Sequence, residues 1–181
     1  IDQISPRMLK ELPVKGFIII TYIFNAIVRL DYWPNQFKTS LIKMIPKTGK
    51  DQHLVTSYRP ISLLPILSKI LEKLLLQDIL KESNIFPDHQ FGFRKEHSTI
   101  QQCHRIASHI YNSFESKQYC TAVFLDVKQA FDKVCHDRLV TKIRLYLPVK
   151  YHNILTSYIV NRKFIIKVSS SSSDVFPIKS G

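Results

Sequence analysis

The sequence predicts a single α+β domain in which helices dominate. Apolar residues spaced three and four positions apart are the commonest pattern, and the strand candidates are scattered between these segments rather than alternating with them as in a parallel βαβ fold. A length of 181 residues suits one core, and 45% hydrophobic with 22% charged residues is ordinary globular composition. No linker or internal repeat divides the chain.

Helices are predicted at Pro6–Leu12, Phe17–Leu30, from Leu67 to just before Ile85, Thr99–Phe114, Arg138–Leu145 and His152–Val160. In the third of these segments, apolar residues recur at helical spacing with charged residues between them. They are Ile70, Leu71, Leu74, Leu75 and Ile79. Ser98 or Thr99 precedes the fourth segment as a candidate N-cap.

Strands are predicted at Leu41–Ile45, Tyr119–Val127 and Phe164–Val168. The run YCTAVFLDV at Tyr119–Val127 is apolar on both alternating faces, which is typical of a central strand covered on each side. The serine-rich stretch Ser169–Asp174 lies between two short β-branched and aromatic runs. It therefore predicts a hairpin connection.

The charge of the chain predicts an anionic partner. Lysine and arginine number 26 against 14 aspartates and glutamates, a net charge of +12, and the isoelectric point is about 9.7. Basic residues cluster at Lys38, Lys43, Lys47, Lys50 and Arg59, with PKTGK as a turn after the strand. Such a loop suits a polyphosphate or a nucleic-acid backbone, although a lysine in a turn is also commonly just solvated.

The sequence gives little support for a disulfide scaffold, a zinc protein or a membrane protein. Cys103, Cys120 and Cys135 are odd in number and form no CxxC pair, so neither a disulfide framework nor a zinc site is predicted, and His136 is interpreted as structural. The apolar run from Gly16 is far shorter than the roughly 20 residues of a membrane span. We expect an intracellular protein of the cytoplasm or nucleus, without a membrane, and interpret both ends as cuts through a longer protein.

Asp126 is the first candidate for chemistry. A carboxylate at the end of a buried apolar strand is costly unless a positive group meets it, and a metal ion would do so. The alternative is that Asp126 caps the following turn or pairs with Lys128. Asp132 is interpreted as a structural hydrogen-bonding residue, and Asp137 as the N-cap of the next helix.

Three segments together resemble one family. They are SYRPISLLPILSKILEKLL at 57–75, QFGFRKEHSTIQQ at 90–102 and AVFLDVKQAFDKVCHDRL at 122–139. In this order and spacing they resemble the reverse transcriptases of non-LTR retrotransposons, LINE-like elements of the jockey group. The upstream stretches IDQISPRMLKELP and FNAIVRLDYWPNQFKTSLIKMIPKTGK are also similar to that family, so the resemblance extends over essentially the whole chain.

The resemblance implies part of a right-hand polymerase fold, helix-rich with a small antiparallel sheet. Residues 1–116 would be fingers and palm-supporting helices, and residues 117–181 the proximal palm. The implied activity is RNA-directed DNA synthesis, with an RNA template, a DNA primer and deoxynucleoside triphosphates as partners. The alternative is a non-catalytic, basic nucleic-acid-binding module derived from a retroelement.

The same resemblance implies roles for individual residues. Asp126 would be the catalytic metal ligand, Phe131 the aromatic group beneath the incoming sugar that excludes a ribose, and Gln129 and Ala130 the donors of backbone N–H groups to the triphosphate. Lys47 and Arg59 would bind the triphosphate, and Arg94 lies in the next fingers motif. Gln129 departs from the lysine that the family more often has.

The implied cofactors are two Mg²⁺ or Mn²⁺ ions, which need at least two carboxylates to hold them about 3.5–4 Å apart. The family supplies the others from a downstream hairpin with adjacent aspartates, and no adjacent pair occurs in this sequence. The final residues IKSG resemble the opening of the family's GxPQGS segment. We therefore expect no polymerisation by this chain alone.

Overall fold

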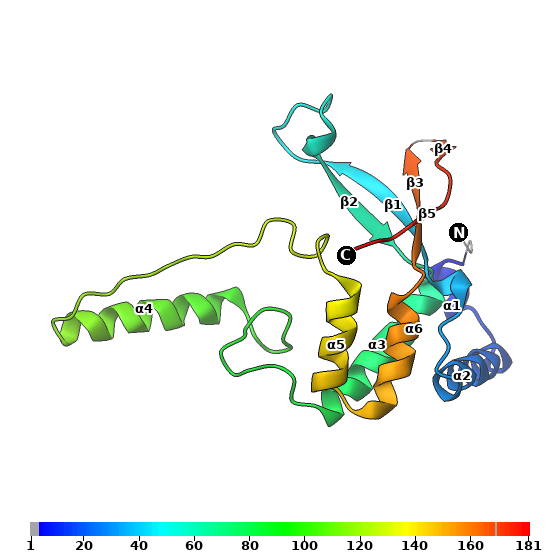
Figure 1. Ribbon diagram of the computed structural model, residues 1–181, viewed down its shortest axis with the longest axis horizontal. Coiled ribbons are helices and arrows are strands. Elements are labelled where there is room, and N and C mark those ends of the chain that lie inside the picture. The colour runs from blue at the N-terminus through cyan, green and yellow to red at the C-terminus, as the bar shows by residue number, and fades with distance from the viewer. Residues whose placement is uncertain (1–3, 169) are drawn as a thin grey trace. The chain divides into compact units, whose positions relative to one another are not determined.

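The computed structural model describes residues 4–168 and 170–181, and Figure 1 shows the order of its elements. It is helix-rich with a small sheet, as the sequence predicts. The chain forms two compact units: one contains the residues up to Ser83 together with Phe131–Gly181, and the other is Asn84–Ala130. The division into fingers and palm at residue 116 concerns function and stays a prediction.

The larger unit contains most of the helices. They are α1 (Pro6–Lys10), α2 (Val14–Arg29), α3 (Ile66–Glu82), α5 (His136–Tyr146) and α6 (His152–Ile159), with short 3-10 turns η1 (Asn35–Phe37), η2 (Val55–Ser57) and η3 (Val149–Tyr151). Each of the five α-helices confirms a predicted helix, with ends shifted by a few residues. Asp137 is not the N-cap of α5, because Cys135 is. Asp137 lies instead in the first turn, where the helix dipole favours a carboxylate.

The core of this unit lies between α2, α3 and α6. The spacing of apolar residues gives each helix one apolar face, and these faces are buried. The buried residues are Phe24 and Ile27 on α2, Leu71, Leu75 and Ile79 on α3, and Ile154 and Ile159 on α6. Ile70 and Leu74, on the predicted apolar face of α3, remain partly exposed. Trp33, after α2, is only 1% exposed and is a core residue.

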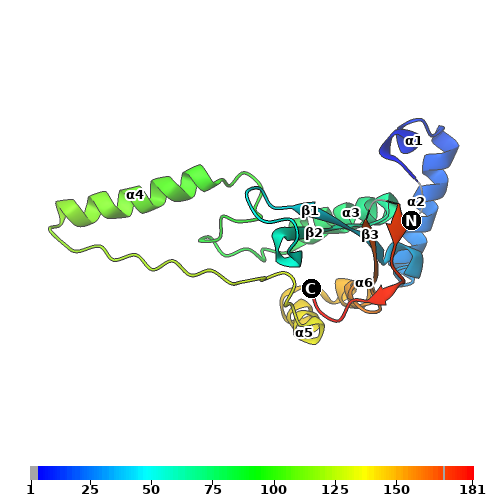
Figure 2. The ribbon, with the colours of Figure 1, turned by 90° about the horizontal axis from the view of Figure 1, so that it is seen from above.

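The sheet is mixed, so the prediction of an antiparallel sheet is wrong in part. Its strands are β1 (Thr39–Pro46), β2 (Tyr58–Leu63), β3 (Lys163–Val168), β4 (Ser171–Ser172) and β5 (Phe176–Pro177). β1 pairs antiparallel with β2 but parallel with β3, with Leu41 opposite Ile165. Parallel neighbours need a long crossover, and several helices separate β1 from β3 along the chain. Figure 2 shows β1, β2 and β3 side by side from above.

Two further findings concern the edges of the sheet. β2 is not predicted by the sequence because Pro60 interrupts its strand pattern, but β2 is an edge strand, where a missing N–H is tolerated. The predicted hairpin is confirmed, since β3 pairs antiparallel with both β4 and β5. Ser169, in its connection, lies outside the described residues.

The Asn84–Ala130 unit is built around α4 (Thr99–Glu115). Ser98 is its N-cap, as predicted: Ser98 Oγ accepts from the Gln101 N–H at 3.3 Å, and Gln101 Oε1 accepts from the Ser98 N–H at 2.8 Å. The loop before α4 packs on its first turns, because the Arg105 guanidinium lies 4.9 Å from the centre of the Phe91 ring.

The predicted central strand at Tyr119–Val127 is wrong for this structure. The segment has no regular secondary structure and its side chains are exposed, with Phe124 at 82% and Leu125 at 90%. A strand that is apolar on both faces needs neighbouring strands and cover on each side. Among the described residues, none of the five strands pairs with this segment.

None of the helices in residues 4–168 and 170–181 combines the length and the hydropathy that crossing a membrane requires.

Candidate nucleotide and nucleic-acid site

Two predicted triphosphate ligands, Lys47 and Arg59, meet at one end of the β1–β2 ladder. Ile45 lies opposite Arg59 and Pro46 opposite Tyr58. The ladder then continues through the backbone N–H of Lys47, which donates to the carbonyl of Ser57 at 2.7 Å. Antiparallel pairing thus brings together two cations that are twelve positions apart, since 59 − 47 = 12.

The two cations differ in their surroundings. The Lys47 ammonium donates to the carbonyl of Thr56 at 2.6 Å, across the loop between β1 and β2, whereas the Arg59 side chain is exposed. Gly49 in this loop has φ +74°, so the predicted PKTGK turn is confirmed and uses glycine where the backbone is left-handed. One of the three ammonium N–H groups is occupied by Thr56, and an anion can accept from the others.

Lys38 does not belong to the basic surface, although its sequence position suggests it. Its side chain is buried at 5% exposure, and its ammonium donates to the carbonyl of Val160 at 3.2 Å. Burial lowers the pKa of Lys38 because desolvation disfavours the charged form. Lys38 therefore connects β1 to the end of α6.

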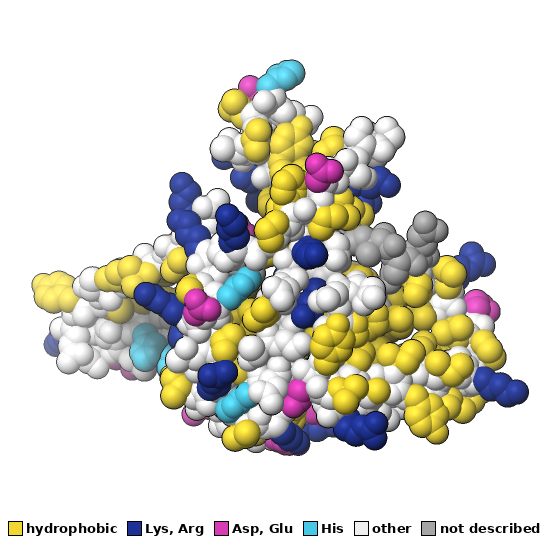
Figure 3. Space-filling model, turned by 45° about the vertical axis from the view of Figure 1, so that its right-hand side comes forward, with side chains coloured by type: hydrophobic (Ala, Val, Ile, Leu, Met, Phe, Trp, Pro, Cys, Tyr) yellow, Lys and Arg dark blue, Asp and Glu magenta, His cyan; other side chains and the backbone are white. Residues whose placement is uncertain are grey.

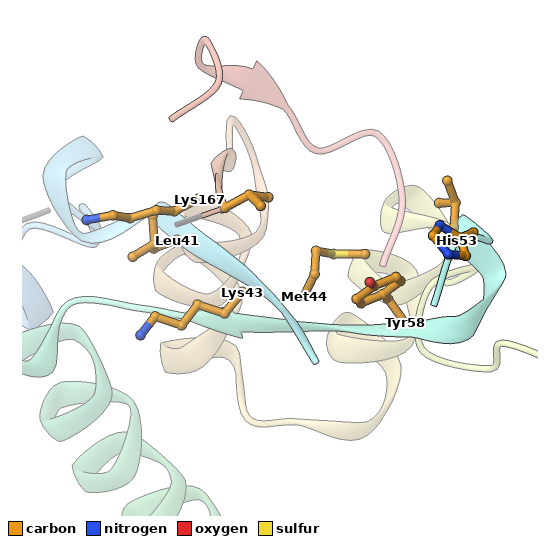
Figure 4. Close-up of a pocket in the computed structure, with 8 residues that line it drawn as sticks. Leu41, Lys43, Met44, His53, Tyr58 and Lys167 are labelled. Carbon is orange, nitrogen blue, oxygen red and sulfur yellow. The ribbon is translucent and has the colours of Figure 1, made fainter. Parts of the chain in front are cut away.

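A groove of about 860 Å³ lies along β1 beside this ladder. Figure 4 shows its labelled lining residues, Leu41, Lys43, Met44, His53, Tyr58 and Lys167. Lys43 lies directly opposite Lys167 in the parallel register of β1 and β3. The groove thus combines two ammonium groups with aliphatic and aromatic walls, a pairing suited to phosphates and bases.

The loop that walls the groove is itself tied down. The Tyr58 hydroxyl donates to the carbonyl of Gln52 at 3.0 Å, and the backbone N–H of His53 donates to Asp51 Oδ1 at 2.9 Å. Figure 3 shows basic and hydrophobic side chains mingled over one face of the molecule. Sequence reasoning missed His53, Tyr58 and Lys167 as lining residues of this groove. Lys167 reaches the groove only because β3 pairs in parallel with β1, and no periodic signal in the sequence shows that pairing.

The predicted nucleotide-binding residues Gln129, Ala130 and Phe131 lie in a turn at residues 128–133. Along the chain, the boundary between the two compact units falls between Ala130 and Phe131. Gln129 has φ +57°, a left-handed conformation that reorients the peptide before Ala130. Such conformations can aim neighbouring backbone N–H groups at an anion. Phe131 is the residue at which the chain re-enters the larger unit, and its side chain is 70% exposed.

Arg94 braces its own loop. Its guanidinium donates to the carbonyl of Pro87 at 3.4 Å and lies 3.9 Å from Asp88 Oδ1. The Arg94 side chain is 26% exposed, so part of its charge still faces solvent.

Asp126 lies in the exposed 119–127 segment rather than at the end of a buried strand. In the described part of the chain, no group of three or more His, Cys, Asp or Glu residues could hold a metal ion. An aspartate oxygen is a suitable ligand for Mg²⁺ or Mn²⁺, but one carboxylate does not form a two-ion site. The residues described here therefore do not make a complete metal centre.

Of the predicted site residues, the structure brings together Lys47 and Arg59. Lys47, Arg59 and Phe131 belong to one unit, whereas Arg94, Asp126, Gln129 and Ala130 belong to the other. Cys103, Cys120 and Cys135 are free and exposed.

A small mixed sheet in a helix-rich chain is compatible with part of a reverse transcriptase, and sequence comparison defines the class. The family described as reverse transcriptase (RNA-dependent DNA polymerase) matches residues 45–180, more than half of the chain. The chain belongs to the reverse transcriptase family.

Three of the similar proteins are named as RNA-directed DNA polymerases, certain or probable, of Drosophila melanogaster mobile elements. The chain is 47% identical to the probable RNA-directed DNA polymerase from transposon BS, over 96% of the chain and 19% of that protein. It is 43% identical to the probable RNA-directed DNA polymerase from transposon X-element, and 37% identical to the RNA-directed DNA polymerase from mobile element jockey. Each of these two matches covers 99% of the chain and 20% of the relative.

The resemblance to non-LTR, jockey-type polymerases is thereby confirmed. The chain spans about a fifth of the length of these relatives.

Proposed function

We propose that the chain is the fingers and proximal palm of an RNA-directed DNA polymerase of a non-LTR retrotransposon. In this proposal residues 1–116 form the fingers and palm-supporting helices, and residues 117–181 the first part of the palm. The complete protein copies an RNA template from a primer 3′-hydroxyl with deoxynucleoside triphosphates. The observation that carries the proposal is the meeting of Lys47 and Arg59 within the family match.

Lys47 and Arg59 bind the triphosphate of the incoming nucleotide. The ammonium of Lys47 acts as a compact charge, and the Arg59 guanidinium offers a planar fork that fits two phosphate oxygens at once. Their neighbouring positions at the end of the β1–β2 ladder let one polyphosphate accept from both. Binding requires Lys47 to exchange the Thr56 carbonyl for a phosphate oxygen.

The turn around Gln129 contributes backbone donors and a steric gate. The N–H groups of Gln129 and Ala130 bind the triphosphate, a role in which the glutamine side chain is not needed. The Phe131 ring packs beneath the sugar and clashes with a ribose 2′-hydroxyl. Sugar selectivity then follows from exclusion of the wrong substrate rather than from a contact with the correct one.

The groove beside Lys43 and Lys167 receives the template strand. Two lysines opposite each other in register neutralise successive phosphates, while Tyr58 and Met44 offer surfaces for a base. Arg94 adds a further cation from the fingers.

Asp126 provides one carboxylate ligand of the divalent-ion site. Mg²⁺ or Mn²⁺ ions bound there activate the primer hydroxyl and stabilise the leaving pyrophosphate in this class of enzyme. The family supplies the other carboxylates from a downstream pair of adjacent aspartates, and the described residues hold no group of three or more His, Cys, Asp or Glu that could bind a metal ion. This 181-residue chain by itself is therefore a binding unit without the complete catalytic centre.

The test uses a polymerase that contains these 181 residues and extends primers, such as a chimera with the jockey polymerase. Lys47→Gln and Arg59→Gln are each expected to raise KM for deoxynucleotides at least tenfold, the loss expected when a charge-assisted bond worth about 1.5–3 kcal/mol is removed. Lys50→Gln, in the same loop, is the matched control. Equal KM values for all three variants would contradict the assignment.

The non-catalytic alternative is favoured by one observation: the described residues contain no group of three or more His, Cys, Asp or Glu that could hold a metal ion. The coding sequence beyond residue 181 decides between the two functions. An adjacent aspartate pair there supports the polymerase, and an open reading frame that closes without one supports the binding module.

A further inference from the structure

The final residues of the chain return to the turn that follows Phe131. Ser180 Oγ donates to the carbonyl of Asp132 at 3.0 Å, and the backbone N–H of Gly181 donates to the carbonyl of Val134 at 3.1 Å. All of these residues belong to the same compact unit. Two segments nearly fifty positions apart, since 180 − 132 = 48, are thus joined by one side-chain-to-backbone and one backbone-to-backbone hydrogen bond.

The same final segment is fixed to the sheet at its other end. β5 pairs with β3, where Phe176 lies opposite Phe164, and the backbone N–H of Ile178 donates to the carbonyl of Arg162 at 2.9 Å. Figure 1 shows the chain passing from β5 to its C-terminus. Residues 176–181 therefore form a bridge between the sheet and the turn.

Gly181 packs so closely against the turn that a side chain here would require its neighbours to shift. A Cβ atom at this position would lie 3.1 Å from both the Asp132 Cα and the Phe131 carbonyl oxygen. Its φ of +90° also favours glycine over every other residue. The contact is therefore made by backbone against backbone, and it reaches the Phe131 peptide itself.

His136 completes the contact with a side chain. Its Nε2 lies 3.0 Å from the carbonyl oxygen of Gly181. That oxygen can only accept, so the imidazole must donate from Nε2. His136 is the first residue of α5 and follows Phe131 by five positions, so it connects the helix, the turn and the final segment.

We infer that His136 is a positioning residue: its hydrogen bond to Gly181 holds residues 178–181 against the 131–134 turn and so fixes the backbone from which Phe131 projects. The inference rests on the proposed function, in which Phe131 excludes a ribose. His136 touches neither substrate nor ion in this role. It acts through the turn, because a shift of the Phe131 backbone would move the ring that must clash with a 2′-hydroxyl.

The first test measures hydrogen exchange in this 181-residue chain by NMR. His136→Phe keeps a planar ring without the donor, and His136→Gln keeps an N–H group. We expect the Gly181 amide to exchange at least about fivefold faster in His136→Phe, since the acceptor in this 181-residue chain is an oxygen of the Gly181 carboxylate, and near the unsubstituted rate in His136→Gln. The Lys47 amide, which donates to Ser57, serves as the internal reference for folding.

The second test measures selectivity in a primer-extending polymerase that contains these residues. His136→Phe and Gly181→Ala are each expected to reduce discrimination between deoxy- and ribonucleotides at least fivefold, with primer–template affinity unchanged. His136→Gln, which keeps an N–H donor, should retain most of the discrimination. The matched control is His152→Phe. His152 also begins a helix, and its Nε2 lies 2.8 Å from the backbone carbonyl oxygen of Leu147, to which it donates.

The outcomes separate this inference from the proposed function. Unchanged Gly181 exchange in His136→Phe, or equal selectivity in His136→Phe and His152→Phe, overturns the role of His136. If instead Phe131→Ala leaves sugar selectivity unchanged while the Gly181 exchange responds to His136→Phe, the gate is wrong and the structural contact stands.

Discussion

Trp33 packs against Tyr158, with ring centres 4.5 Å apart and planes inclined by 47°. The backbone N–H of Trp33 also donates to Ser157 Oγ at 2.9 Å, so two contacts join the segment after α2 to α6. Trp33 is only 1% exposed, and the chain continues from it into β1. The segment that leads into β1 is therefore joined to the helical core through Trp33.

The first prediction is that Trp33→Ala destabilises the chain strongly. Replacing a buried tryptophan with alanine leaves a cavity, so we expect a loss of about 3–5 kcal/mol in the free energy of unfolding. Denaturant titration measured by circular dichroism checks this. Tyr32→Ala, at a neighbouring residue that is 50% exposed, is the control and should change stability by less than about 0.5 kcal/mol. Equal losses would mean that the indole is not a core residue.

The second prediction concerns alkaline pH. Burial raises the pKa of Tyr158 to about 12, with a further upward contribution from Glu72, despite the opposing Arg162. The folded state therefore retains the phenol proton where the unfolded state, with a pKa near 10, releases it. The stability contribution of Tyr158 is present below pH 10 and is lost progressively as pH rises toward 12.

Tyr158→Phe checks this effect, because phenylalanine cannot ionise. The difference in melting temperature between the two proteins should shift in favour of Tyr158→Phe as pH rises above 10. A difference that stays constant with pH would show that the hydroxyl of Tyr158 is solvated.

The helices were predictable because their information is local. Apolar spacing places Leu71, Leu75 and Ile79 on one face of α3, and Ser98 with Gln101 marks the start of α4. The end of a helix is less certain, as the Asp137 example shows. Both Cys135 and Asp137 can precede a helical turn, and only the backbone geometry decides between them.

The sheet and the site were only partly predictable because they depend on long-range pairing. Lys47 and Arg59 were identified from the family resemblance, but their meeting depends on β2, which Pro60 conceals. The Lys43–Lys167 pair depends on parallel pairing between distant strands. The 119–127 segment has strand composition, yet composition does not supply the neighbours that a strand needs.

The third prediction is salt-dependent binding of single-stranded RNA. With a net charge of +12, the chain should lose affinity steeply as salt rises, because phosphate contacts release counterions. Substituting both Lys43 and Lys167 by Gln should lower the slope of log K against log salt by about 1.4, roughly 0.7 for each lost contact. Fluorescence anisotropy over a salt series provides the measurement.

The control for this prediction removes the same charge elsewhere. Lys69 and Lys73 are exposed on α3, and their double substitution by Gln leaves the same net charge as the groove variant. If both double variants change the slope equally, the groove has no particular role and binding depends on overall charge alone.

The fourth prediction is that this chain alone does not extend primers. With Mg²⁺ or Mn²⁺, an RNA template and a DNA primer, incorporation should stay at background, because Asp126 has no carboxylate cluster around it in the described residues. Denaturing gel analysis of a labelled primer measures this. Extension above background would show that other carboxylates of the chain, with Asp132 the first to test, complete the site.

The fifth prediction separates chemistry from selectivity in a primer-extending polymerase that contains these residues. Asp126→Asn keeps the size of the side chain but removes its charge, so kcat should fall by at least a hundredfold while primer–template affinity stays nearly unchanged. Phe131→Ala leaves that carboxylate in place and removes the ring. Deoxynucleotide incorporation should then persist at a reduced rate, while discrimination against ribonucleotides falls.

Steady-state incorporation of matched deoxy- and ribonucleotides by the two variants checks both effects in one experiment. Asp137→Asn is the matched control for charge, because Asp137 lies in the first turn of α5 and has no role in the proposed site. Near-normal kcat in Asp126→Asn would remove Asp126 from the metal site, and unchanged sugar selectivity in Phe131→Ala would remove the gate. Since one residue acts on the rate and the other on the choice of sugar, failure of one assignment leaves the other standing.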